Sequence, residues 1–266
     1  WGRPVYTGTC WGRCDVSGHS KWATIKRKKG AADAKRSNQF AKLLRAVEVA
    51  TREGGSGDVK ANMTLASAVD KARSSSVPVD NIERAIKRGS GDLEGGARYE
   101  EVTYEGYGPG GVAMFVETLT DNRNRTTQDV RHAFTHSGGN LGENGSTAWM
   151  FSRKGSIQVE KDAAPDEEKL LEIALEAGAE DLNDSESTWE ITSDPASFAA
   201  VRDAIEAAGI PMLSAELTML PQSTVPVEGG QAKQVLALLE ALEELDDVQN
   251  VYANFDIPES VMAELG

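Results

Sequence analysis

The sequence predicts an α+β protein of three domains, in which an N-terminal three-helix domain precedes two small α/β domains. Apolar residues recur at helical spacing up to about residue 91, whereas the short apolar alternation typical of strands begins near residue 102. The charge changes over the same boundary: residues 17–91 hold 16 lysines and arginines against 7 acids, and residues 92–266 hold 10 against 34. The chain therefore joins a basic module to an acidic remainder.

Three short helices account for the N-terminal domain, residues 17–91. The apolar face of the first consists of Phe40, Leu43, Leu44, Val47 and Ala50. This helix is expected to end at Gly54-Gly55. Asn62 is a suitable cap for the second helix. Asp80, with Glu83 three residues later, resembles a capping box at the start of the third, which Gly89 ends.

The chain before the first helix has a different character. Residues 17–32 show no apolar period and are rich in cations, so we interpret them as a basic arm that is ordered by what it binds. Residues 1–16 lack an initiator methionine and hold both cysteines, Cys10 and Cys14. We expect these residues to be an extension that is not native, with Val16 as the first codon of the natural chain; a disordered natural tail is the alternative. The remainder has no cysteine, so no disulfide framework supports the fold.

The first α/β domain is expected to be discontinuous. A linker, SGDLEGGA, covers residues 90–97, and apolar alternation on both sides of Pro109-Gly110 then predicts a hairpin. A helix follows from about Asn124 to His136. Strand and helix signals that fit the same order return only over residues 223–256. We therefore assign this domain to residues 92–146 and 221–266.

The intervening residues 147–220 are expected to form the third domain, inserted in the second. A hairpin is predicted from Thr147–Phe151 and Gly155–Glu160. It is followed by a helix, a strand at Trp189, a second helix starting at Asp194-Pro195, and a last strand. The predicted order is hairpin, helix, strand, helix, strand.

Two motifs invite a catalytic or cofactor interpretation, and neither supports one. Residues 106–111, GYGPGG, match G-x-G-x-x-G, but a strand follows instead of the helix that a dinucleotide site needs. His132 and His136 lie four apart on a helix, but a zinc protease needs a glutamate where Ala133 stands. No acid–base couple stands out among the many carboxylates. The chain is therefore predicted to be no enzyme and to hold no cofactor or metal.

The basic module has the features of a nucleic-acid interface. Lysine and arginine neutralise phosphates, and a tryptophan stacks on a base. The predicted contact residues are Lys21, Trp22, Lys26, Arg27, Lys28, Lys29, Lys35, Arg36 and Lys42. Arg45 continues the same basic stripe along the first helix.

Two further features lie in the acidic part. Arg123 and Arg125, at the start of the helix expected near residue 124, are candidates for contact with phosphate. Salt bridges with nearby carboxylates are the alternative for both. Trp149 is expected to be a core or hairpin aromatic rather than a stacking platform.

Five blocks of this sequence resemble the YebC/PmpR family in the expected order. They are GHSKWATIKRKKGAADAKR at 18–36, PVDNIERAIKRG at 78–89, YEGYGPGGVA at 104–113, TDNRNRT at 120–126 and GGNLGENGSTAWMF at 138–151. The likeness spans about residues 17–260. It implies a helical domain followed by two α/β domains, a cytoplasmic location, DNA binding and control of transcription. It carries no catalytic residues over to this chain.

The same resemblance implies a second role. A mitochondrial relative activates translation of a respiratory-chain subunit, and some bacterial relatives look like ribosome-associated factors that assist peptide synthesis at proline runs. The basic arm suits DNA or ribosomal RNA. A third hypothesis is an adaptor whose acidic α/β domains recruit a basic protein. No apolar run approaches the roughly 20 residues of a membrane span, so no membrane partner is expected.

Overall fold

The structure, a computed structural model, describes residues 33–92, 98–163, 166–185 and 187–257, with side chains from Ser37 onward. The chain divides into two compact units: one contains residues 153–220, and the other contains the described residues before and after them. A helical region precedes regions of mixed helix and sheet, so the predicted α+β class is confirmed. The domain boundaries given above stay predictions. No helix in the described ranges is long and apolar enough to cross a membrane.

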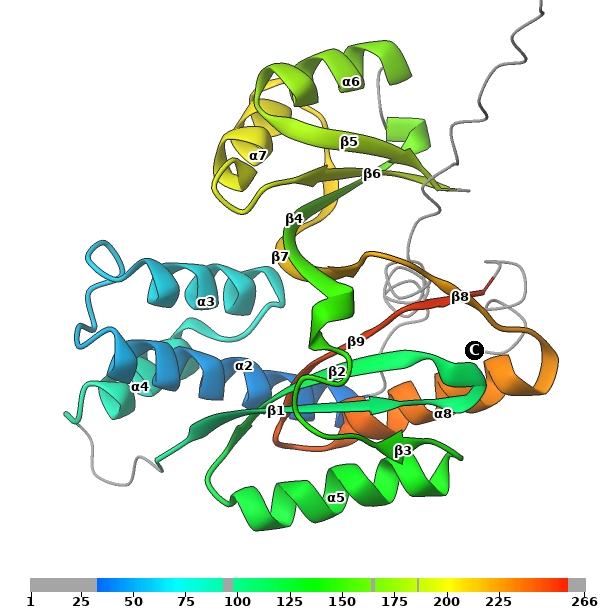
Figure 1. Ribbon diagram of the computed structural model, residues 1–266. Coiled ribbons are helices and arrows are strands. Elements are labelled where there is room, and N and C mark those ends of the chain that lie inside the picture. The colour runs from blue at the N-terminus through cyan, green and yellow to red at the C-terminus, as the bar shows by residue number, and fades with distance from the viewer. Residues whose placement is uncertain (1–32, 93–97, 164–165, 186, 258–266) are drawn as a thin grey trace, which may run out of the picture. The chain divides into compact units, whose positions relative to one another are not determined.

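Three helices of the N-terminal region pack around one small core (Figure 1). They are α2 (Asp33–Glu53), α3 (Met63–Ser74) and α4 (Val79–Gly89). The fully or almost fully buried side chains of this core include Val47, Leu65, Val69 and Ile82. Asn62 caps α3 as predicted, since its side chain accepts a hydrogen bond of 3.0 Å from the backbone N–H of Leu65.

The predicted capping box of α4 is wrong. The helix begins at Val79, its cap position is Pro78, and no side chain caps it. Asp80 therefore lies inside the first turn, where its negative charge interacts favourably with the unpaired N–H groups at the start of the helix. At the other end of α4, a Cβ on Gly89 would come within 2.4 Å of the Glu48 carbonyl oxygen on α2. Glycine at this position allows the two helices to approach closely.

The first α/β domain is built on a four-stranded sheet in the order β3-β1-β2-β9. Its strands are β1 (Glu100–Tyr107), β2 (Ala113–Thr120), β3 (Asn140–Leu141) and β9 (Val248–Ala253). β1 and β2 pair antiparallel, and Gly110 between them has a φ of 73°, which favours glycine. The predicted Pro-Gly hairpin is thus confirmed. A separate parallel pair consists of β8 (Val225–Pro226) and β10 (Phe255–Asp256).

Two helices, α5 (Arg123–His136) and α8 (Gly229–Glu244), cover one face of this sheet (Figure 1). The core between the helices and the sheet includes the buried Val130, Phe134, Leu238, Leu239 and Val251. The start of α5 and the turn that follows α8 meet at one corner of the domain. The candidate site is built at this corner.

A second sheet has the order β5-β6-β4-β7. Its elements are, in chain order, β4 (Phe151–Glu160), α6 (Glu167–Glu176), β5 (Ala179–Asp184), β6 (Thr188–Ser193), α7 (Phe198–Ala207) and β7 (Met212–Pro221). The hairpin predicted over residues 147–160 is wrong, because β4 is one strand and the hairpin joins β5 to β6. Gly155 lies inside β4 at a point of close packing, since Phe198 leaves no space for a side chain there. The order is strand, helix, hairpin, helix, strand.

Candidate nucleic-acid interface

One face of α2 contacts the end of α8 through polar side chains. Asn38 Nδ2 donates to the Glu244 carbonyl oxygen at 3.0 Å. Lys42 Nζ donates to the Glu243 carbonyl oxygen at 2.6 Å. The last carbonyl groups of a helix have no partner within the helix and carry partial negative charge, so an ammonium group is favourable there. Residues four apart lie on one face of a helix, which is why both side chains reach the same helix end.

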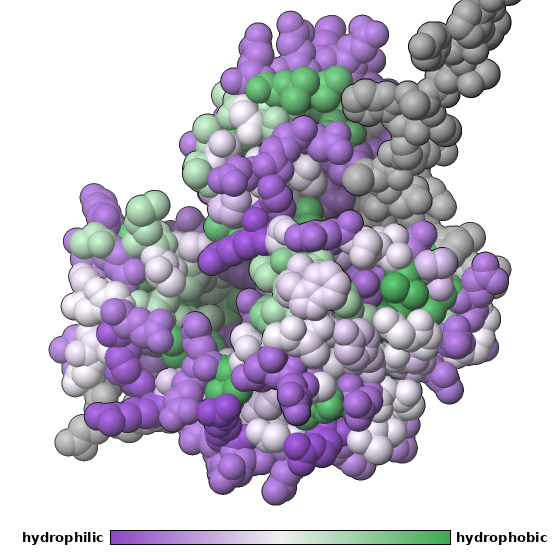
Figure 2. Space-filling view, viewed as in Figure 1, coloured by the Kyte–Doolittle hydropathy of each residue, from purple (hydrophilic) through white to green (hydrophobic). Residues whose placement is uncertain are grey.

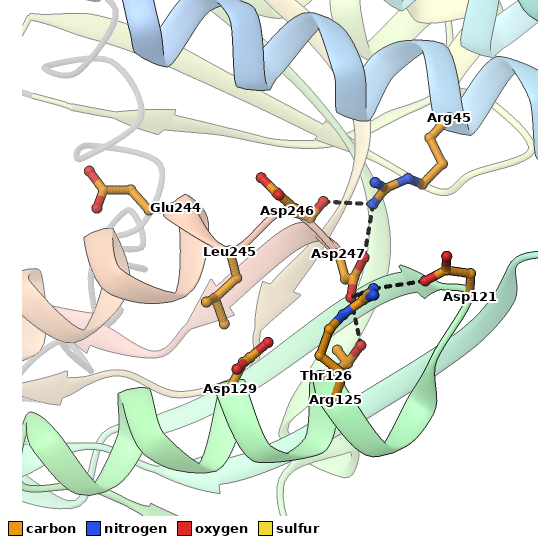
Figure 3. A pocket seen from close by; sticks show the side chains of 9 residues that line it. All are labelled: Arg45, Asp121, Arg125, Thr126, Asp129, Glu244, Leu245, Asp246 and Asp247. Atoms are coloured by element: carbon orange, nitrogen blue, oxygen red, sulfur yellow. Dashed lines mark hydrogen bonds and ion pairs between the residues drawn. The ribbon is translucent and has the colours of Figure 1, made fainter.

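Arg45 extends this contact to the turn after α8 (Figure 3). Its Nη1 donates to the Asp246 carbonyl oxygen at 2.7 Å and to Asp247 Oδ1 at 3.2 Å. The same nitrogen lies 3.3 Å from the Leu119 carbonyl oxygen, and the guanidinium carbon lies 5.0 Å from the centre of the Tyr99 ring. A guanidinium group suits this position because it donates in several directions and stacks on aromatic faces.

Asp247 is the acceptor at the centre of this corner. Its side chain is buried, and Oδ2 accepts hydrogen bonds from Arg125 Nη2 at 2.8 Å and from Thr126 Oγ1 at 2.7 Å. Burial alone would raise the pKa of Asp247. The hydrogen bonds from Arg125 and Thr126, with the positive charges of Arg125 and Arg45, outweigh burial and bring this pKa below its usual value. The carboxylate is therefore held in its ionised form as a shared acceptor for α2 and α5.

Arg125 lies between two carboxylates at the start of α5. Its Nη2 lies 2.7 Å from Asp121 Oδ1 and 2.8 Å from Asp247 Oδ2. Hydrogen bonding to Asp247 and then to Asp121 raises the pKa of the Arg125 guanidinium. Its backbone N–H donates to the side chain of Asn122, the cap of α5. These ion pairs are the salt bridges that the sequence offered as the alternative to phosphate contact.

These side chains surround a pocket of about 590 Å³. It is lined by Arg45, Asp121, Arg125, Thr126, Asp129, Glu244, Leu245, Asp246 and Asp247 (Figure 3). The acids outnumber the two arginines, and both arginines already donate to acids of the lining. The pocket is therefore negatively charged and unsuited to a phosphate group. Within the described ranges, no group of three or more histidine, cysteine, aspartate or glutamate side chains could hold a metal ion.

The predicted contact residues of the arm lie outside the described residues: Lys21, Trp22, Lys26, Arg27, Lys28 and Lys29. Lys35 and Arg36 belong to the first turn of α2. Lys42 and Arg125 both contact the corner where α8 ends and β9 begins. Arg123 is exposed at the first position of α5, and no ion pair of its side chain is found in the part of the chain that the structure describes.

Glu105, on β1, is a buried carboxylate that holds the loop between β3 and β4. Its oxygens accept hydrogen bonds from the backbone N–H groups of Gly145 at 2.6 Å, Thr147 at 2.7 Å and Ala148 at 2.7 Å. Burial alone would raise the pKa of Glu105, but these hydrogen bonds lower it below its usual value. Because three backbone donors converge on one carboxylate, this part of the loop is fixed to the sheet.

Trp149 follows directly after these residues, and its predicted place in a core or hairpin is wrong. It lies in the short 3₁₀ turn Ala148–Met150 and is 66% exposed. The loop held by Glu105 turns this residue outward before β4 begins. Phe151 takes the buried position instead, with its ring centre 6.3 Å from that of Phe115.

The GYGPGG motif and the pair His132 and His136 both lie in ordinary structural positions. Residues 106–111 span the turn between β1 and β2, and β2 follows them. His132 and His136 are both exposed on α5, with ring centres 5.8 Å apart. Sequence reasoning missed Glu105 and Asp247. Each is an acid in a strongly acidic stretch, so no local signal separates it from a solvated carboxylate.

Two family models together match most of this chain. A model described as the TACO1/YebC protein N-terminal domain matches residues 20–92. A model described as the TACO1/YebC second and third domain matches residues 99–255.

Similar proteins of full length are found in several bacteria. A protein of Geobacter sulfurreducens is 56% identical over 250 residues, which cover 94% of this chain and 100% of that protein. One of Rubrobacter xylanophilus is 57% identical over 250 residues, covering 94% of this chain and 99% of that protein. Both are named probable transcriptional regulatory proteins. The crystal structure of a conserved hypothetical protein from Aquifex aeolicus matches with a TM-score of 0.75 and 48% identity, covering 85% of this chain and 92% of that one.

Proposed function

Because this chain belongs to the TACO1/YebC family, we propose that it is a non-enzymatic DNA-binding protein that regulates transcription in the cytoplasm. Its basic N-terminal module, residues 17–91, contacts the phosphate groups of DNA. The names of its relatives support the regulatory role. The nucleic-acid partner rests on the charge distribution of this chain.

The observation that carries the proposal is the concentration of cations before and at the start of α2. Residues 17–36 contain Lys21, Lys26, Arg27, Lys28, Lys29, Lys35 and Arg36, against the single acid Asp33. Each phosphate that such a side chain neutralises releases counterions, and this release drives much of DNA binding. Residues 92–266, with 34 acids, repel the same phosphates. Contact is therefore concentrated at the basic end, where Trp22 adds a ring that stacks on a base.

The helix that follows the arm in the sequence is held in place. Asn38, Lys42 and Arg45 attach α2 to the end of α8 and the following turn. Lys42 and Arg125 are already held by internal acceptors. We therefore assign Lys42 and Arg125 a smaller share of the phosphate contact than the arm. On α5, the exposed Arg123 is the better candidate for phosphate contact.

Two carboxyl groups of the described residues, Glu105 and Asp247, have pKa values that do not suit a general base. A general base that works at neutral pH needs a pKa raised towards 7. The pKa values of Glu105 and Asp247 are shifted in the other direction, because hydrogen bonds outweigh the effect of burial in each. We infer that both carboxylates serve the structure and not catalysis.

Two measurements on the full-length chain test the proposal. Electrophoretic retardation of duplex DNA fragments at physiological salt is expected to be sequence-dependent. In sucrose gradients of a cell lysate, the chain is expected to stay apart from ribosomes. Sedimentation with ribosomal RNA, without sequence-dependent retardation of DNA, would reassign the chain to a ribosome-associated translation factor. Binding to no nucleic acid at all would refute the proposal.

A further inference from the structure

Trp149 presents an aromatic ring to solvent, at 66% exposure. Of the large hydrophobic side chains that are exposed in the described part of the chain, it is the aromatic one. Contact between water and so large a ring is unfavourable, and tryptophan is normally well buried in a folded chain. A partner that covers the ring would remove this unfavourable contact.

The loop holds the ring in one orientation. The indole Nε1–H donates to the Ser146 carbonyl oxygen at 3.1 Å. The Tyr107 hydroxyl donates to the same oxygen at 2.9 Å. With the three backbone N–H groups that donate to Glu105, these bonds tie the residues before Trp149 to β1. The ring is thus placed in advance, so binding does not have to order it.

The ring offers its flat faces and no free hydrogen-bond donor. Because the Nε1–H is used within the loop, a partner gains stacking and contact area only. A nucleobase needs no more than this, since every base has a π face and stacking tolerates any sequence. A phosphate group has no such face, so Trp149 adds a kind of contact that the cations of the arm do not provide.

A protein partner fits this ring less well, because among the described residues no other exposed large hydrophobic side chain belongs to this loop or to the sheet that holds it. A stable protein interface surrounds an aromatic anchor with further apolar contacts. The other exposed large hydrophobic residues in the described ranges are Met63, Val79, Leu175, Leu213 and Leu217. Met63 and Val79 belong to the helical region and the three leucines to residues 153–220, so none lies in the sheet whose strand β1 holds the Trp149 loop. On the face shown in Figure 2, hydrophobic side chains likewise form small, separate groups.

We propose that Trp149 is a stacking platform for an unpaired nucleobase. This inference rests on the proposed nucleic-acid binding and adds a contact that is remote in sequence from the basic arm. The base belongs to a looped or single-stranded segment, because neighbouring bases cover both faces of a base inside a duplex. The arm supplies affinity that falls with salt, and Trp149 supplies affinity that does not depend on counterion release.

The test measures the affinity of the full-length chain for fluorescently labelled single-stranded DNA, single-stranded RNA and duplex DNA at several salt concentrations. Trp149→Ala is expected to weaken binding of a single strand by about 5- to 100-fold at each salt concentration, with an unchanged salt slope and unchanged duplex binding. Trp149→Phe is expected to keep most of the affinity, because a phenyl ring still stacks. The comparison of DNA with RNA shows which polymer supplies the base.

Leu175→Ala is the matched control, since it removes an exposed apolar side chain of α6, outside the basic module, and is expected to bind as the wild type does. Circular dichroism is expected to show Trp149→Ala folded. If the wild type binds single strands and Trp149→Ala binds them equally well, the stacking inference fails and the proposed function stands. If the wild type binds no nucleic acid, the proposed function itself fails.

Discussion

Arg45 and Asp247 join the helical region to the first α/β domain through an ion pair of 3.2 Å. Among the described residues, the hydrophobic core of the helices and that of the α/β domain have no member in common. Asn38 and Lys42 add hydrogen bonds to the end of α8. These three contacts between α2 and the domain are polar, and such contacts weaken when salt screens the charges or acid removes them.

Removal of the Asp247 carboxylate should destabilise the fold. Asp247→Ala leaves Arg45, Arg125 and Thr126 without their shared acceptor, and we expect the free energy of unfolding in urea to fall by about 1–3 kcal/mol. Asp121→Ala is the matched control, because it removes a half-exposed carboxylate from the same Arg125. Its expected cost is below about 1 kcal/mol. Equal losses in the two variants would contradict the central place given to Asp247.

Acid should unfold the chain partly through Glu105 and Asp247. Both have a pKa below the usual value in the folded chain, because hydrogen bonds outweigh burial. The unfolded chain therefore takes up these protons at a higher pH than the folded chain. The stabilisation is complete above the unfolded pKa values of about 4 and is lost as the pH falls through the lower folded values.

Melting temperatures between pH 7 and acid pH measure this effect. The wild type is expected to lose stability steeply below about pH 4. A double variant, Glu105→Gln with Asp247→Asn, should be less stable than the wild type at pH 7. Its melting temperature should fall less than that of the wild type on acidification. If the plots of melting temperature against pH were parallel for the wild type and the double variant, these carboxylates would not be the cause of the acid sensitivity.

Gly89→Ala should separate α4 from α2. The new Cβ would lie 2.4 Å from the Glu48 carbonyl oxygen and 2.6 Å from Thr51 Cβ, so the helices must move apart. We expect a loss of about 1–3 kcal/mol in the free energy of unfolding. Gly230→Ala, in the first turn of α8, meets no atom within 4 Å and is expected to be neutral or slightly stabilising. A neutral Gly89→Ala would show that this packing is looser than described.

The two tryptophans of the described chain should respond differently to truncation. Trp189 is 8% exposed in the core of residues 153–220, and Trp189→Ala is expected to cost about 3–5 kcal/mol of unfolding free energy. Trp149→Ala removes a ring that is 66% exposed and is expected to cost less than about 1 kcal/mol. Urea denaturation measures both. A large loss for Trp149→Ala would indicate a structural role for the ring.

Patterns that depend on neighbouring residues predicted the fold well. The end of the first helix at Gly54-Gly55, the cap at Asn62 and the turn at Pro109-Gly110 each have a local physical cause, and the structure has all three. The predictions are wrong where one residue type occurs in two different structural settings. In the sequence Gly155 indicates the start of a hairpin strand, but in the structure it makes room for Phe198 inside β4.

The polar corner and the Glu105 loop could not be predicted in the same way. Glu105 accepts from Gly145, which is 40 residues away, and Asp247 accepts from Arg125 across 122 residues. No periodicity or cap links such distant positions, and each acid has many acidic neighbours in the sequence. The exposure of Trp149 depends on the loop that Glu105 holds, so it could not be predicted from the sequence either.

The salt dependence of DNA binding tests the central claim most directly. One variant replaces Lys26, Arg27, Lys28 and Lys29 with glutamine. The matched control replaces the exposed Arg131, Arg153, Lys169 and Lys233, with the same change of charge. We expect the arm variant to bind duplex DNA more weakly and its plot of log affinity against log salt to be shallower by about 3 to 4. The control should bind as the wild type does. An unchanged affinity and slope in the arm variant would contradict the claim that the basic arm contacts phosphate.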